Sequence, residues 1–196
     1  MSALARSTVA ETPDWVVGEM PPGYQTRMAE IQRLSDEMHA MDAIGRVLWQ
    51  TGDPLKHAVR ALLSSLKCEV EPSEDADAPI SAKLDQTRRL LFLVADAAGP
   101  IQKTSQDLAH AFQIMQFADE RDRVVLVTNV DPSARPSERP SAVTADAQKV
   151  VQRMGVNILE ASTLFGLWRL SLQDATKART LLERLHAHDG GPLALT

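Results

Sequence analysis

The sequence is poor in residues that several protein classes require. It has one cysteine, Cys68, in 196 residues, which excludes an internal disulfide framework, and no cysteine and histidine pairs occur at zinc-ligand spacing. No segment contains the roughly 18 uninterrupted apolar residues of a membrane span, and residues 1–12 lack the apolar run of a secretory signal. We therefore expect a soluble, cytoplasmic protein with no membrane span.

Positive charge is also scarce. The chain has 21 Lys and Arg residues against 26 Asp and Glu residues, which gives a net charge of −5. Proteins that coat nucleic acid use Lys and Arg to neutralise phosphates and usually carry a net positive charge. The composition therefore disfavours general nucleic-acid binding, although it leaves room for a local basic patch.

The pattern of apolar and charged residues divides the chain into three parts. Residues 1–21 contain Pro13 and Pro21, and Pro22 follows directly, which predicts an irregular N-terminal strap over residues 1–21. Residues 22–50 predict a long amphipathic helix, because apolar side chains recur every three or four residues while charges fill the other face. Residues 51–190 predict a mixed α/β domain.

The helix predicted over residues 22–50 is long for a small domain, and its apolar seam resembles a coiled coil. Such a helix either lies across its own domain or serves as a dimerisation arm. We favour the arm, and hence self-association into a homodimer. The predicted interface residues are Met28, Ile31, Leu34, Met38, Met41 and Leu48.

Residues 51–190 alternate between strand-like and helix-like segments. Short runs of Val, Ile and Leu predict buried strands, and apolar residues at helical spacing predict the helices between them. After a first helix the expected order is β-β-β-α-β-α-β-α-α, which indicates a mixed sheet flanked by helices. The expected strands are 68–71, 80–84, 90–95, 124–128 and 156–159.

Several short sequences occur in an order that is found in a known superfamily. They are Thr51-Gly52-Asp53-Pro54-Leu55, Cys68-Glu69-Val70-Glu71, Asn129, Pro136-Ser137-Glu138-Arg139-Pro140, Thr144-Ala145-Asp146-Ala147 and Leu164-Phe165. With these sequences and the order of its strands and helices, the segment 51–170 resembles bacterial members of the PD-(D/E)xK restriction-endonuclease-like superfamily. The resemblance implies a restriction-endonuclease-like mixed β-sheet flanked by helices, here preceded by a long N-terminal helix.

The resemblance also implies where a nuclease site should lie. In the superfamily, acids on the second and third strands bind Mg²⁺, and a lysine two residues after the second acid stabilises the reacting phosphate. Aligning Asp96 and Gly99 with that pattern places Ala98 at the lysine position. Shifting the register places Leu93 and Ala95 at the acid and lysine positions. Both alignments lose the lysine, which implies a pseudoenzyme that works by binding a ligand or a protein partner and needs no cofactor.

Three other interpretations stay open. One is a purely structural interaction protein whose cleft is filled by the side chains of Leu93 and Ala95. A migrated lysine, Lys103, together with Asp77 and Asp96, would form a rearranged Mg²⁺-dependent nuclease site. Alternatively, basic side chains of the old cleft would hold a nucleotide or another phosphate-containing ligand. The candidates for that ligand site are Arg88, Arg89, Lys103, Arg135 and Arg139.

Overall fold

A six-stranded mixed sheet organises the C-terminal part of the chain, and its strands follow one another in sequence order. The pairs β1–β2 and β2–β3 are antiparallel, whereas β3–β4, β4–β5 and β5–β6 are parallel. The strands are β1 (Glu69–Val70), β2 (Ile80–Lys83), β3 (Arg89–Val94), β4 (Asp122–Thr128), β5 (Asn157–Glu160) and β6 (Gly191–Pro192). The parallel half requires helical crossovers, and these place helices on both faces of the sheet.

The computed structural model describes residues 13, 15–73, 75 and 77–193, and the chain divides into units 1–41 and 42–196. The first unit contains α1 (Val16–Glu19) and most of α2 (Tyr24–Gly45). The second unit contains the sheet, two short 3-10 helices and five α-helices. These are η1 (Arg46–Leu48), α3 (Gly52–Ser65), α4 (Gln106–Phe117), η2 (Pro136–Glu138), α5 (Ala145–Arg153), α6 (Ala161–Ser171) and α7 (Ala175–Ala187).

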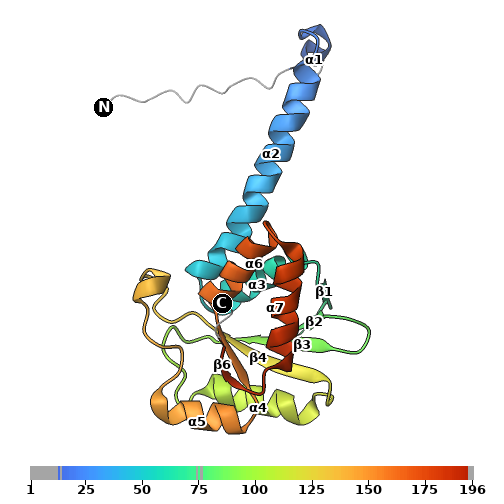
Figure 1. Cartoon of the computed structure of the whole chain (residues 1–196). Helices are drawn as coiled ribbons and strands as arrows, with labels where there is room; N and C mark the ends of the chain where they lie inside the picture. Colours follow the sequence, from blue (N-terminus) through green and yellow to red (C-terminus); the bar gives the residue numbers. More distant parts are fainter. Residues whose placement is uncertain (1–12, 14, 74, 76, 194–196) are drawn as a thin grey trace, which may run out of the picture. The chain divides into compact units, whose positions relative to one another are not determined.

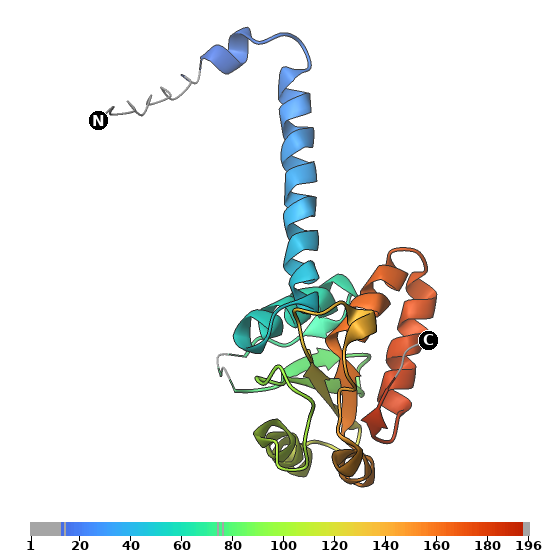
Figure 2. The ribbon, with the colours of Figure 1, turned by 90° about the vertical axis from the view of Figure 1, so that its left-hand side faces the viewer.

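Helices α3, α6 and α7 cover one face of the sheet, and α4 and α5 cover the other (Figures 1 and 2). The side chains of β3 alternate between the two layers, with Leu90 and Phe92 in the first core and Leu91 and Leu93 in the second. Because both faces are covered, the four consecutive residues are all buried, which explains the continuous apolar run in the sequence.

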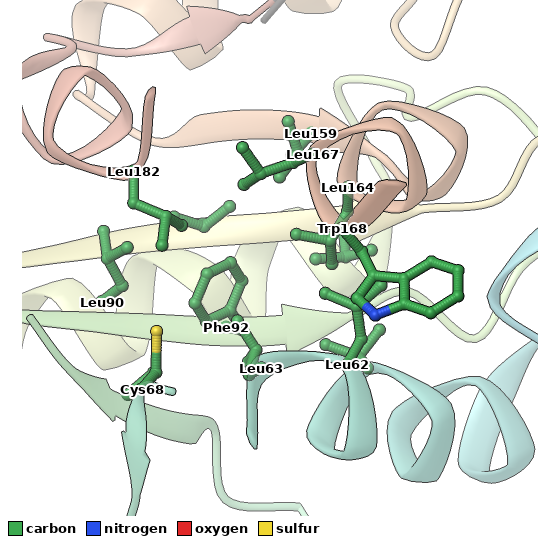
Figure 3. Close-up of a cluster of buried hydrophobic side chains, with 14 of the residues drawn as sticks. Leu62, Leu63, Cys68, Leu90, Phe92, Leu159, Leu164, Leu167, Trp168 and Leu182 are labelled. Atoms are coloured by element: carbon green, nitrogen blue, oxygen red, sulfur yellow. The ribbon is translucent and has the colours of Figure 1, made fainter. Parts of the chain in front are cut away.

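The larger core lies between β3, β4 and the helices α3, α6 and α7. Phe92 is fully buried and sits among leucines contributed by these helices, including Leu63 and Leu182 (Figure 3). At one end of this core the indole Nε1 of Trp168 donates a hydrogen bond to the Ser65 hydroxyl at 3.1 Å. The buried tryptophan therefore has its polar atom satisfied while its ring fills the space between α3 and α6.

The structure confirms the predicted mixed α/β architecture and the long helix that precedes it. The helix ends at Gly45, however, and Leu48 lies half-buried in η1 instead of continuing the α2 seam. The sequence did not predict α1, which lies in the strap expected to be irregular, or the short edge strand β6. Residues 1–12 and 14 of that strap lie outside the described residues. Among the helices described, none is long and apolar enough to cross a bilayer.

Candidate functional site

A cavity opens at the carboxyl end of β3. Because β2 runs antiparallel to β3, with Ile80 opposite Phe92, the loop before β2 reaches the same edge of the sheet as the residues after β3. The cavity has a volume of about 300 Å³ and is bounded by this loop, by the β3 end and by the first turns of α3 and α4. Its polar lining residues are Asp53, Lys56, Asp77, Asp96, Asp107 and His110.

The structure brings together two of the three residues predicted for a rearranged nuclease site. Asp77 and Asp96 line the same cavity, and both also line an adjoining cavity that Asp107 and His110 share. The backbone N–H of Asp96 donates to Oδ1 of Asp107 at 3.3 Å, which ties the β3 end to the first turn of α4. The carboxylates outnumber the cations at this edge, so the field of the cavity favours cations over phosphate.

Lys103, the third predicted residue, is placed elsewhere. It is exposed and does not line this cavity. Its charge acts at the start of α5: the pKa of Asp146 is lowered, first by a hydrogen bond from the Thr144 hydroxyl and also by the attraction of Lys103. The cation beside Asp77 and Asp96 is instead Lys56, whose Nζ donates to the Ala78 carbonyl at 2.7 Å.

The positions that would carry the nuclease acid and lysine in the shifted register are apolar and buried. Leu93 is 6 % exposed and Ala95 is 1 % exposed, and both belong to the core between the sheet, α4 and α5. In the other register the lysine position falls on Ala98, which is exposed. Within the described residues, no group of three or more His, Cys, Asp or Glu side chains is arranged to hold a metal ion.

The predicted phosphate-binding residues lie at two opposite edges of the sheet. Arg88 and Arg89 are at the amino end of β3, whereas Lys103, Arg135 and Arg139 follow the carboxyl ends of β3 and β4. A six-residue strand spans about 20 Å. The five side chains therefore do not converge on one ligand.

Three of these arginines are engaged by the protein itself. Arg88 pairs with Asp85 at 2.6 Å, and Arg89 pairs with the buried carboxylate of Asp122 at 2.7 Å, which raises the pKa of the Arg89 guanidinium. Arg139 donates to the Asn129 side chain and to the Leu48 and Ala134 carbonyls. Asn129 and Arg139, two residues on which the superfamily resemblance rests, thus hold the loop after β4 against η1.

The second candidate surface is one face of α2, here called the apolar face of α2. It consists of Met28, Ile31, Leu34, Met38 and Met41, whose side chains are 46–65 % exposed. Large apolar side chains scattered singly on a surface are ordinary, but five on one face of a helix form a contiguous patch. Leu48, the sixth residue predicted for this interface, is outside the helix and half-buried.

Comparison with known proteins adds no further assignment. No family model matches the chain, and neither a curated protein nor a solved structure shows significant similarity to it. The two surfaces described above therefore carry the functional argument.

Sequence reasoning missed four residues of the cavity: Asp53, Lys56, Asp107 and His110. Asp53 and Asp107 resemble helix-capping residues in the sequence, and a capping role requires no cleft. The structure begins α3 at Gly52 after Thr51 and begins α4 after Ser105, so both aspartates lie inside first turns that face β3. The order of the elements could have located these residues, because α3 precedes the β2–β3 hairpin and α4 follows it.

Proposed function

We propose that this chain is a catalytically inactive restriction-endonuclease-like protein that acts as an interaction module and forms a homodimer through the apolar face of α2. The observation that carries the proposal is the exposure of five large apolar side chains on one face of a single helix. A surface helix of a globular protein normally packs such residues against the core of its own domain. A partner that covers them supplies the missing packing.

The size of the surface suits a second copy of the chain. About half of each of the five side chains is exposed, which is roughly 100 Å² per residue, so two copies would bury about 1,000 Å² in total. That area is at the lower end of specific interfaces. Helix α2 has two arginines against four acidic residues, whereas interfacial membrane helices are rich in Lys and Arg. A membrane surface therefore fits the apolar face of α2 less well than a second copy of the chain does.

The inactive nuclease part of the proposal is supported by the side chains at the β3 end. Leu93 and Ala95 carry neither charge nor hydrogen-bonding groups, and both are buried in a core. A carboxylate at position 93 would need a metal or a hydrogen-bonding partner in that environment. This apolar packing supports a catalytically inactive protein.

Replacing Ile31 and Met38 together by glutamate should abolish the dimer, because each copy would bring two charges into an apolar seam. We expect the full-length chain to sediment as a dimer and Ile31→Glu/Met38→Glu to sediment as a monomer, with the dimer Kd raised about a hundredfold or more. The matched control is Ala29→Glu/Ala40→Glu, which adds the same charges to exposed positions on the opposite face of α2. A monomeric wild type, or a control that dissociates equally, would refute the proposal.

A second candidate function, a Mg²⁺-dependent nuclease with a rearranged site, has one observation in its favour. Asp77 and Asp96 face one cavity, and Lys56 takes the place expected for Lys103 beside them. Two carboxylates and a cation are the parts that metal-assisted phosphodiester cleavage needs.

Calorimetric titration of Mg²⁺ and Mn²⁺ separates the two functions. Our proposal expects no saturable binding in the millimolar range. The nuclease alternative expects binding that disappears in Asp96→Ala and persists in Asp36→Ala, an exposed acid on α2. If that pattern is found, a cleavage assay with Lys56→Met and Lys103→Met would identify the lysine that matters.

A further inference from the structure

Two charges on α2 stand out because they have no partner. Glu30 and Glu37 form ion pairs with Arg33, and Asp36 accepts a hydrogen bond from Gln32. Arg27 and Asp42 are exposed, and neither makes an ion pair or a side-chain hydrogen bond within the part of the chain that the structure describes. The other Asp, Glu and Arg side chains of this helix are thus engaged inside the helix.

The two unpartnered charges lie on the same face as the apolar residues. At about 100° per residue, Arg27 is within roughly 20° of Met38, and Asp42 is within roughly 20° of Ile31. Arg27 is near the amino end of the apolar face and Asp42 is just past its carboxyl end. The face therefore has a positive end and a negative end, with an apolar centre between them.

We propose that the two copies pair through the apolar face of α2 in antiparallel orientation, with Arg27 of each copy beside Asp42 of the other. The inference rests on the homodimer proposed above and specifies its geometry. In an antiparallel arrangement centred between residues 34 and 35, residue 27 of one copy lies level with residue 42 of the other. Residue 28 then lies level with residue 41, and residue 31 lies level with residue 38. Apolar residues then face apolar residues along the seam, and both of its ends close with an ion pair.

A parallel arrangement of the same helices has the opposite electrostatics. It brings Arg27 against its own copy and Asp42 against its own copy, so like charges meet at both ends of a short seam. Like charges across an interface disfavour a pairing, and opposite charges select it. Glu30 and Glu37 discriminate less between the two orientations, because both carboxylates already share the guanidinium of Arg33 within each helix.

Single-cysteine cross-linking distinguishes the orientations. In an antiparallel dimer, position 28 lies about 20 Å from position 28 of the other copy, since 13 residues of helix separate the levels of 28 and 41. A disulfide requires Cα atoms within about 7 Å. In a Cys68→Ala background, we expect Met28→Cys alone and Met41→Cys alone to give no cross-linked dimer on oxidation. Co-expression of the two chains, one carrying a tag, should give a mixed disulfide.

Each other result has a definite meaning. Cross-linking of Met28→Cys with itself would establish a parallel dimer and overturn the orientation while leaving the dimer intact. No cross-link in a sample that sediments as a dimer would likewise overturn this pairing. A wild-type chain that sediments as a monomer would instead overturn the proposed function on which the inference rests.

A charge exchange within one chain provides an independent test. Arg27→Glu and Asp42→Arg should each raise the dimer Kd about tenfold, because each breaks two symmetric ion pairs and adds repulsion. The double variant Arg27→Glu/Asp42→Arg should return the Kd to within about threefold of wild type, since the pairs re-form with reversed sign. In a parallel dimer the double variant would retain like charges at both ends and gain nothing over the single variants.

Discussion

Gly190→Ala is expected to lower the free energy of unfolding by about 3–4 kcal/mol, because an added methyl group meets backbone and the residue has a positive φ. A Cβ at this position would lie 2.7 Å from the Cα and 2.9 Å from the carbonyl carbon of Gly155, and φ is +101°. Neither atom can move without shifting the end of α5. The Gly190 N–H also donates to the buried Asn157 side chain at 3.0 Å, and this bond would be disturbed.

Two neighbouring substitutions separate the steric effect from the conformational one. Gly191 also has a positive φ, +100°, but a Cβ there meets only Gln152 Cβ, at 4.0 Å. Gly191→Ala should therefore cost about 1–2 kcal/mol. Gly166 is exposed inside α6 with open space around it, so Gly166→Ala should raise stability by about 0.5–1 kcal/mol. Urea unfolding of the three variants gives the ranking, and equal losses at 190 and 191 would contradict the clash.

Gly190 and Gly191 also show why one strand of the sheet could not be predicted from the sequence. The central strands β3 and β4 could be predicted, because both are buried on both faces and their apolar runs are continuous. Strand β6 consists of Gly191–Pro192 and has no apolar alternation. Its pairing with β5 depends on the close approach of Gly190 to Gly155, two residues that are distant in sequence. A local pattern contains no information about such an approach.

The residues of the cavity at the β3 end also differ in how far the sequence predicts them. Antiparallel pairing of β2 with β3 follows from their closeness in sequence, so the sequence could predict that Asp77 lies near Asp96. Lys56 could not be predicted there, since its position at the cavity depends on how α3 packs against the sheet through residues such as Leu55 and Val59. The apolar face of α2 could be predicted from the helical period alone, because that period places its five residues on one side of the helix.

Arg139→Met is expected to lower the free energy of unfolding by about 2–3 kcal/mol, because three backbone or side-chain acceptors lose a charged donor. The guanidinium donates to the Asn129 amide oxygen and to the Leu48 carbonyl, and its Nε donates to the Ala134 carbonyl at 3.1 Å. Methionine preserves the length of the side chain but donates nothing. Arg135→Met in the same loop is the control, since Arg135 is exposed and makes no side-chain hydrogen bond to the described residues.

Asn129 belongs to the same hydrogen-bond network as Arg139, so the energetic coupling between the two residues can be measured. Asn129 is 1 % exposed, and its Nδ2 donates to the Val47 carbonyl at 3.2 Å and to the Gln50 carbonyl at 2.8 Å. Asn129→Ala should therefore cost about 2–3 kcal/mol by leaving those carbonyls without their donor. Because Arg139 also bonds to Asn129, the double variant should cost at least about 1 kcal/mol less than the sum of the single losses.

That coupling also decides between two roles for Arg139. If it serves chiefly to fix the β4 loop on η1, unfolding free energies measured with urea will show the coupling, and added phosphate will not change them. If Arg139 were a ligand-binding residue released from the network, Arg139→Met would leave stability near that of Arg135→Met, and the two losses would simply add. We expect the first result, because all three guanidinium nitrogens of Arg139 already donate to acceptors of the chain itself.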